Sequence, residues 1–296
     1  MSRHHHYIAE SYQRNFTNEK FKVWVLTPLG KIFNSNPRNI FNEKDFYKIK
    51  FDDFPEPLLV ENSLGEIENN FALLVRNKIS KRIELNRMDQ ALLSFFCSGM
   101  LIRTKLCRKS IKNGLQEVLD DMEDLKSNSE SKENLNGMTS FDDGGKSITY
   151  DDLKNGLKNF DSFHSLSCIE TPPDLAPIIF HMNFILMIAP VSSEFISSDN
   201  PLVICSPERE LKYGVTAIGS RAGLCHKDIE LTLPLSSKVA LCANWANKQS
   251  GNIYTLATEK QVDQINYRTM RLADNLIASK EEILRSILEK SNNLIK

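Results

Sequence analysis

The spacing of hydrophobic residues changes along the chain, from short extended stretches to a helical period. Two apolar stretches near the N-terminus, Val23–Leu26 and Lys31–Phe33, flank Pro28–Gly30, and this pattern predicts a β-hairpin. From Ser63 onward the apolar residues recur at helical spacing, as Ile67, Phe71, Leu74, Val75 and Ile79. Ser63 and Glu66 have the spacing of a capping box, so we expect a helix to begin at Ser63.

A second helix is expected from Asn86 or Arg87 to about Lys112. Arg103 falls within its apolar stripe rather than opposite it. A guanidinium on a buried face needs a carboxylate, a phosphate or several carbonyls, because it cannot lose its charge. Arg103 is therefore either a paired core arginine that joins two elements or an anion-binding arginine in a cleft. Later helices are expected at Tyr150–Phe160, Leu175–His181, Thr258–Ala278 and Lys280–Ile295.

The second half of the chain contains apolar runs with the length and composition of strands. They are Phe184–Val191, Leu202–Ile204, Glu230–Ser237 and Val239–Cys242. A stiff linker at Thr171–Pro173 precedes them. The pattern predicts a single α+β domain over residues 1–296, with a helical first half packed against a mostly antiparallel sheet. We expect the N-terminal hairpin and the 185–245 strands to form that sheet.

A short polar segment lies between two of these strands, within Phe195–Val203. Asn200 precedes Pro201, so its backbone is restricted to an extended or turn conformation. Asp199 and Asn200 are therefore expected to project from a rigid corner, where a fold can hold a carboxylate and an amide in constant geometry. The alternative is an Asx-type turn whose side chains cap their own backbone.

The composition of the chain excludes some kinds of protein but does not indicate a reaction. The 296 residues carry a formal net charge of -1, which gives no argument from overall charge for a nucleic-acid or membrane partner. The six cysteines form no CxxC pair and no zinc-type spacing. The chain shows no signal peptide and no apolar run of bilayer-spanning length, so we expect a cytoplasmic protein with reduced thiols.

Charge is nevertheless unevenly distributed. Residues 76–112 contain ten Lys or Arg and two acidic residues, whereas residues 113–143 contain nine Asp or Glu and two lysines. The basic stretch could follow a nucleic-acid backbone, or it could be a solvated helix face neutralised by its acidic neighbour. We expect the Ser-, Asn- and Gly-rich segment at about 127–147 to be a mobile acidic loop.

The N-terminus supplies two further candidates for chemistry, His5 and His6. Neighbouring residues of an extended strand face opposite ways, so at least one of these imidazoles is expected to point into a cleft. Imidazole is the side chain best suited to proton transfer near neutral pH, although isolated histidines are commonly structural.

The segment His5–Phe16 resembles the opening of the bacterial domain-of-unknown-function family 4238, whose members begin with a His-His-x-Val-Pro-x-x-Tyr-Leu-x-x-Phe pattern. Ala9 and Gln13 depart from that pattern. The other matching segments follow in order: Val60-Glu61 to Ile67-Glu68, Arg103-Thr104, Phe195–Pro201, Thr232–Ser236 and Ile265-Asn266. The resemblance implies no settled activity. Similar proteins occur in bacterial and prophage genomes, some in settings that suggest defence against phage.

Two functions are compatible with these residues. The first is an enzyme, a nuclease or a nucleotide hydrolase, acting on a phosphate-containing substrate. In it His5 and His6 transfer protons, Asp199 and Asn200 orient a histidine or hold a divalent metal, and Arg103 binds the anion. The other expected substrate-binding residues are Tyr12, Glu68, Ser198 and Asn266.

The second function is a non-catalytic binding or sensor module for a phage or host factor. In it Asp199 caps backbone amides and Arg103 pairs with Glu68 to fix the fold. The sequence has no HExxH motif, no Gly-rich phosphate loop, no dinucleotide fingerprint and no nucleophile elbow. Convergence of the candidate side chains on one open hollow would favour the first function, and a closed, fully paired set would favour the second.

Overall fold

A computed structural model describes residues 4–51, 54–56, 58–128, 142–143, 146–147, 149–213, 223–246 and 253–294. The helices are α1 (Glu10–Gln13), α2 (Leu59–Leu74), α3 (Arg87–Ile102), α4 (Lys105–Asn128), α5 (Tyr150–Lys158), α6 (Phe160–Glu170), α7 (Pro172–Phe180), α8 (Pro207–Tyr213), α9 (Glu259–Arg271) and α10 (Glu281–Leu294). Shorter turns are η1 (Arg14–Phe16), η2 (Pro37–Asn39) and the π-helical η3 (Val75–Ile79). The strands are β1 (His4–His6), β2 (Val23–Leu26), β3 (Ile32–Ser35), β4 (Asn42–Lys44), β5 (Asp142–Asp143), β6 (Lys146–Ser147), β7 (Asn183–Ile188), β8 (Ser197–Ser198), β9 (Val203–Cys205), β10 (Glu230–Pro234), β11 (Val239–Asn244), β12 (Ile253–Leu256) and β13 (Leu276–Ala278).

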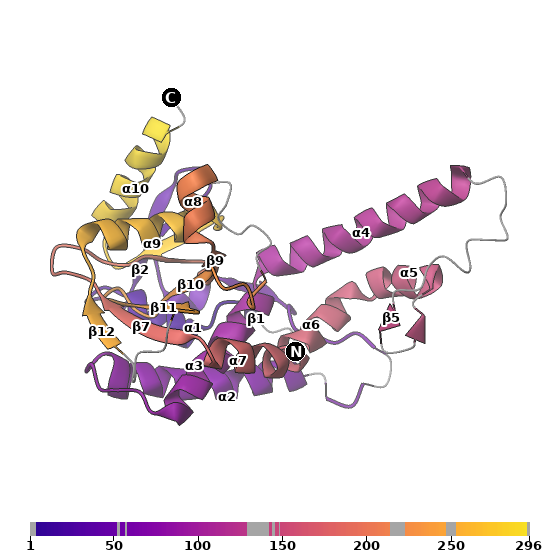
Figure 1. Cartoon of the computed structure of the whole chain (residues 1–296), viewed down its shortest axis with the longest axis horizontal. Coiled ribbons are helices and arrows are strands. Elements are labelled where there is room, and N and C mark those ends of the chain that lie inside the picture. The colour runs from indigo at the N-terminus through magenta and orange to yellow at the C-terminus, as the bar shows by residue number, and fades with distance from the viewer. Residues whose placement is uncertain are drawn as a thin grey trace.

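The larger sheet has the strand order β12-β7-β11-β10-β9, antiparallel except for the parallel pair β12–β7. Alternation of side chains gives it two buried faces. Leu186 and Leu241 lie in the main core with α3, whereas Met187 and Cys242 face Val262 of α9. Figure 1 shows the sheet between a layer of α2, α3 and α7 and a second layer that contains α9.

The N-terminal hairpin belongs to a second, four-stranded antiparallel sheet of order β3-β2-β13-β8. Val25 of β2 faces the main core, and Leu26 faces a separate cluster with Leu284 of α10. The α+β class and the antiparallel pairing are therefore confirmed. The hairpin shares its sheet with one strand of the 185–245 region, β8, and β13 lies between them, whereas β7, β9, β10 and β11 belong to the larger sheet.

Tyr12 joins the helical layer to both sheets. Its ring is fully buried. Its hydroxyl donates to the carbonyl oxygen of Pro234 in β10 at 2.7 Å and lies 2.8 Å from the Ser197 hydroxyl in β8. Because no part of this ring reaches solvent, the expected substrate-binding role of Tyr12 has no geometric basis in this structure, and the residue connects layers of the core.

Two predicted helix boundaries in the first half are wrong. Helix α2 already begins at Leu59, with Ser63 inside it, so Ser63 and Glu66 do not form a capping box. Capping boxes occur instead at Asn86, Thr149 and Thr258. The helix expected to continue to Lys112 is interrupted between α3 and α4, at Arg103 and Thr104.

Three more boundaries differ later in the chain. The helix predicted to end at Phe160 is followed at once by α6, and Pro172 and Pro173 open α7 instead of forming a linker. Proline is tolerated there because the first turn of a helix has no partner for its N–H groups. The helix predicted over Thr258–Ala278 ends at Arg271, since Leu276–Ala278 forms the central strand β13.

Helix α4 runs away from the two sheets with α5 beside it (Figure 1). Its basic first half and acidic second half lie along one helix, so the two halves are not positioned to neutralise each other face to face. Of its basic residues, Lys105 pairs with Glu43 at 2.7 Å. The predicted mobile loop at about 127–147 lies largely outside the described residues, apart from the end of α4 and the ladder β5–β6. No helix in the described ranges has both the length and the apolar character needed to cross a bilayer.

Candidate functional site

The short ladder between β1 and β4 places three histidines next to helix α2. His5 is buried, and its ring is stacked on that of Tyr47 with centroids 5.8 Å apart. The Tyr47 backbone N–H donates to His5 Nδ1 at 2.9 Å. A ring nitrogen that accepts a hydrogen bond carries no proton, so the proton of neutral His5 lies on Nε2, which is 3.2 Å from Oε2 of Glu61. The two atoms lie within ion-pair distance, but neither makes a hydrogen bond among the described residues. With its proton on Nε2, the neutral His5 ring has no lone pair there for a metal.

His6 faces the opposite way and has the complementary tautomer. Its Nε2 lies 3.2 Å from the carbonyl oxygen of Arg38, which can only accept, so Nε2 carries the proton and Nδ1 carries the lone pair. Burial lowers the pKa of His6 below its usual 6.5, although the charges of Glu10 and Glu68 and the hydrogen bond to Arg38 act in the opposite direction. A backbone hydrogen bond with Pro37 also opposes the fall in the pKa of His6. Because the pKa lies below 6.5, His6 is mainly neutral near pH 7, with its unprotonated nitrogen at Nδ1.

Arg103 sits at the break between α3 and α4, with only 3% of its surface exposed. Its Nη2 lies 2.6 Å from Oε1 of Glu68 and donates to the His6 carbonyl at 2.7 Å, while Nε donates to the Tyr47 hydroxyl at 3.1 Å. Burial alone would lower the pKa of Arg103, but Tyr47 and Glu68 raise it above its ordinary value. The pairing of Arg103 with Glu68, expected for a fold-fixing arginine, is present.

Two adjoining hollows open around these residues. The inner hollow, of about 530 Å³, is lined by His5, His6, Tyr47, Glu61, Asn62, Leu64, Gly65, Glu66, Glu68, Asn69 and Arg103. The outer hollow, of about 500 Å³, is lined by His4, His6, Glu10, Arg38, Asn39, Asn42 and Glu61. His6 and Glu61 belong to both, so His6 stands on the boundary between them.

Asp199 and its neighbours lie elsewhere, at the start of β13. The carboxylate of Asp199 accepts from the backbone N–H groups of Asp274 at 3.1 Å and Asn275 at 2.9 Å, and from the Asn275 amide at 2.7 Å. Burial raises the pKa of Asp199, while the Asn275 hydrogen bonds oppose that rise. The Ser198 hydroxyl accepts from the Asn200 N–H at 3.0 Å. None of Ser198, Asp199 and Asn200 lines either hollow.

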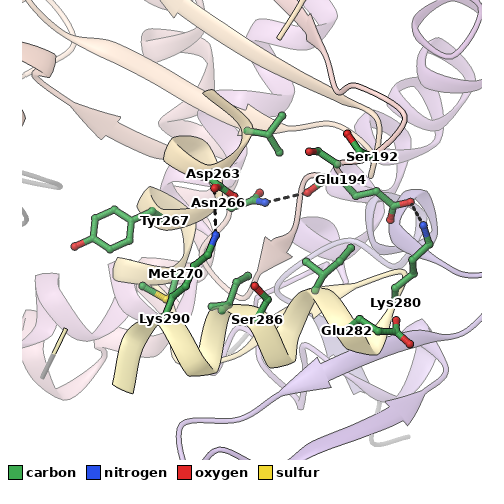
Figure 2. A pocket seen from close by; sticks show the side chains of 14 residues that line it. Ser192, Glu194, Asp263, Asn266, Tyr267, Met270, Lys280, Glu282, Ser286 and Lys290 are labelled. Carbon is green, nitrogen blue, oxygen red and sulfur yellow. Dashed lines mark hydrogen bonds and ion pairs between the residues drawn. The ribbon is translucent and has the colours of Figure 1, made fainter. Parts of the chain in front are cut away.

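Asn266 binds the N-terminal end of the segment that contains Asp199 (Figure 2). Its Oδ1 accepts from the Ile196 N–H at 2.9 Å, and its Nδ2 donates to the Glu194 carbonyl at 2.9 Å. It lines a larger hollow of about 680 Å³ between α9 and α10, remote in sequence from the histidines. Asn266 and Asp199 thus clamp Phe195–Pro201 between α9 and β13, which gives this segment a structural role.

Removal of the Asp199 carboxylate should therefore affect stability rather than catalysis. We expect Asp199→Ala to lower the free energy of unfolding by about 2 kcal/mol, because two backbone N–H groups, one of them partly buried, and the Asn275 amide lose a charged acceptor. Urea denaturation followed by circular dichroism measures this change. Loss of an activity in a variant with unchanged stability would instead restore a catalytic role for Asp199.

Sequence reasoning missed several residues of the hollows. Tyr47, Arg38 and Asn42 act through backbone groups or through contacts about 40 positions away, which no local pattern reveals. His4 could have been found, because alternate residues of a strand share a face and His4 and His6 both line the outer hollow.

Among the described residues, no group of three or more His, Cys, Asp or Glu side chains is close enough together to hold a metal ion.

The chain was compared with models of known protein families. The model of a family described as Protein of unknown function (DUF4238) matches residues 4–282, which include both hollows and the clamped segment. No curated protein and no solved structure matches the chain.

Proposed function

The chain belongs to the DUF4238 family, and we propose that it is an enzyme that cleaves phosphate esters of nucleic acid or nucleotides in the two hollows around His6. The observation that supports this most directly is the state of the His6 ring. Its Nε2–H is held by the Arg38 carbonyl, so the lone pair of the neutral ring is on Nδ1, and the residue lines both hollows. An oriented neutral imidazole with a lowered pKa is suited to general-base catalysis near neutral pH.

Arginines beside His6 offer contacts for an anionic group. Arg38 is exposed and lines the outer hollow, whereas Arg103 lines the inner hollow with its charge shared with Glu68. A phosphate at Arg103 would have to compete with Glu68, so Arg38 is the better first contact. The orienting partner of the histidine in this proposal is the Arg38 carbonyl, not Asp199.

We expect His6→Gln to reduce the rate of phosphate-ester cleavage by about 100-fold or more, which is the usual contribution of a general base. The assay uses the full chain with nucleotides and with single- and double-stranded nucleic acids, with and without divalent metal. His181→Gln is the matched control, because His181 is exposed and also bonds a backbone carbonyl, at 2.7 Å, but lines neither hollow. Equal rates in wild type, His6→Gln and His181→Gln would contradict the proposal.

A binding or sensor module is the second candidate, favoured by the internal bonding of Arg103 and Asp199. In that case the hollow would bind a nucleotide or a phage or host factor without turnover. Saturable binding with unchanged ligand, insensitive to His6→Gln, would identify it. The cytoplasmic location and the role in phage defence remain predictions, and phage challenge of cells that express wild type or His6→Gln tests the second of them.

A further inference from the structure

Building on the function above, we propose that the outer hollow cleaves RNA by transesterification, with the ribose 2′-hydroxyl as nucleophile, His6 as general base and His4 as general acid. The juxtaposition behind this inference is that of His4 and His6 with Arg38 in one hollow.

The two imidazoles share one face of β1. His4 and His6 are alternate residues of the strand, so their Cα atoms are roughly 7 Å apart and their side chains project the same way. Both line the outer hollow, while His5 between them is buried on the other face. This separation allows one ring to reach the entering oxygen and the other to reach the leaving oxygen of the same phosphate.

Hydrogen bonds to the segment Arg38–Asn42 fix which nitrogen of each ring is available. The Asn42 Nδ2 group donates to the carbonyl oxygens of Arg38 at 3.0 Å and Ile40 at 3.3 Å, so Oδ1 is the acceptor that faces His4 Nδ1 at 2.9 Å. His4 therefore keeps its proton on Nδ1 and exchanges protons at Nε2. His6 has the opposite arrangement, with Nε2–H on the Arg38 carbonyl and exchange at Nδ1.

Arg38 supplies a positive charge to the outer hollow, which also contains the carboxylates of Glu10 and Glu61. Glu10 is paired with Arg14 at 2.5 Å, and Glu61 Oε2 is directed at His5. Arg38 has no ion pair within the described ranges and is exposed, so it can contact a phosphate and stabilise the extra charge of the transition state. No lining residue of the outer hollow has a hydroxyl or thiol side chain, so the substrate itself supplies the nucleophile.

The proposed step is balanced without a co-reactant. The 2′-hydroxyl passes its proton to His6 Nδ1 as the O2′–P bond forms. The P–O5′ bond breaks, and His4, protonated on Nε2, gives that proton to the departing 5′-oxygen. The products are a 2′,3′-cyclic phosphate and a 5′-hydroxyl end. Protonation of His4 Nε2 leaves its Nδ1–H bond to Asn42 intact, so the acid form keeps its orientation.

Single-stranded oligonucleotides test the inference with the full-length protein. The substrates are a DNA strand with one ribonucleotide, the same strand with a 2′-O-methyl group at that position, and the all-DNA strand. We expect cleavage only 3′ of the ribonucleotide, with the 2′,3′-cyclic phosphate identified by mass spectrometry. His4→Gln and His6→Gln should each lower kcat by about 100-fold, whereas His181→Gln should not.

The pH dependence adds a readout that separates the two roles. If His6 is the base and His4 the acid, His6→Gln flattens the acid limb of the rate profile and His4→Gln flattens the alkaline limb. Cleavage of all three oligonucleotides at equal, His6-dependent rates would overturn the RNA inference and leave the phosphate-ester function standing. Absence of cleavage of any nucleic acid or nucleotide by folded protein would overturn both. An unchanged RNA-cleaving rate in a doubly substituted protein, purified identically, would also overturn the inference.

Discussion

Glu68→Gln is expected to lower the free energy of unfolding by about 3 kcal/mol, the order observed when one partner of a buried ion pair is removed. Arg103 would keep its charge in a site where only 3% of its surface is exposed, with the neutral Tyr47 hydroxyl and the His6 carbonyl as its remaining partners. The Arg103–Glu68 contact connects the α3–α4 break to α2, and the bond from Arg103 to the His6 carbonyl connects it to β1. Loss of the Glu68 carboxylate should therefore weaken the packing of the segments that line both hollows.

Glu66→Gln is the matched control, because Glu66 lies on the same helix, lines the same inner hollow and is exposed. It should change the free energy of unfolding by less than about 0.5 kcal/mol. The double variant Glu68→Gln with Arg103→Met should recover part of the loss, since it removes the unpaired charge. Urea denaturation provides these values. A loss for Glu68→Gln no larger than that for Glu66→Gln would show that the pair does not stabilise the fold.

The hairpin and the strands of the larger sheet were predictable because their apolar residues show the period and length of strands. Helix boundaries were less predictable, because a sequence can have the spacing of a capping box at a position where no helix begins. Ser63 and Glu66 have capping-box spacing, but the preceding turn contains Val60, which is fully buried, and its burial extends α2 back to Leu59. The break at Arg103 has no Pro or Gly to mark it. The contacts of Arg103 with Glu68 and β1 become apparent only in three dimensions.

The sequence indicated some of the side chains that line the candidate site, but not all of them. His6, Glu68 and Arg103 do line one hollow, as expected of an imidazole and a guanidinium brought together from distant segments. The carboxylates of Glu61 and Glu68 line this hollow, whereas that of Asp199 does not. Asp199 binds backbone groups about 75 positions away, and no local pattern distinguishes such a carboxylate from a catalytic one. The Phe195–Pro201 signature is therefore better explained by the clamp on β13 and α9 than by catalysis.

We expect the free energy of unfolding to fall at acidic pH because of His164. His164 is buried, and its Nδ1 accepts from Nε of Arg108 at 3.1 Å, next to the Cys168 side chain. Burial and the neighbouring positive charge of Arg108 lower the pKa of His164 to about 4, compared with the ordinary value of 6.5 for histidine. Between these two pH values the unfolded chain binds a proton that the folded chain does not. The free energy of unfolding therefore falls as the pH drops from about 6.5 to about 4, by up to about 3 kcal/mol, and this contribution is constant outside that window.

His164→Gln should remove that part of the pH dependence, because the amide can still accept from Arg108 through its oxygen and does not titrate. Urea denaturation of wild type and His164→Gln between pH 4 and pH 8 gives two curves whose difference isolates His164 from the other titrating groups, His6 included. We expect the two curves to lie close together above pH 6.5, where His164 is neutral in both states, and to separate as the pH falls toward 4, with His164→Gln the more stable there. Parallel curves across the range would mean that His164 titrates alike in the folded and unfolded chains, and that the Arg108 contact does not hold it neutral.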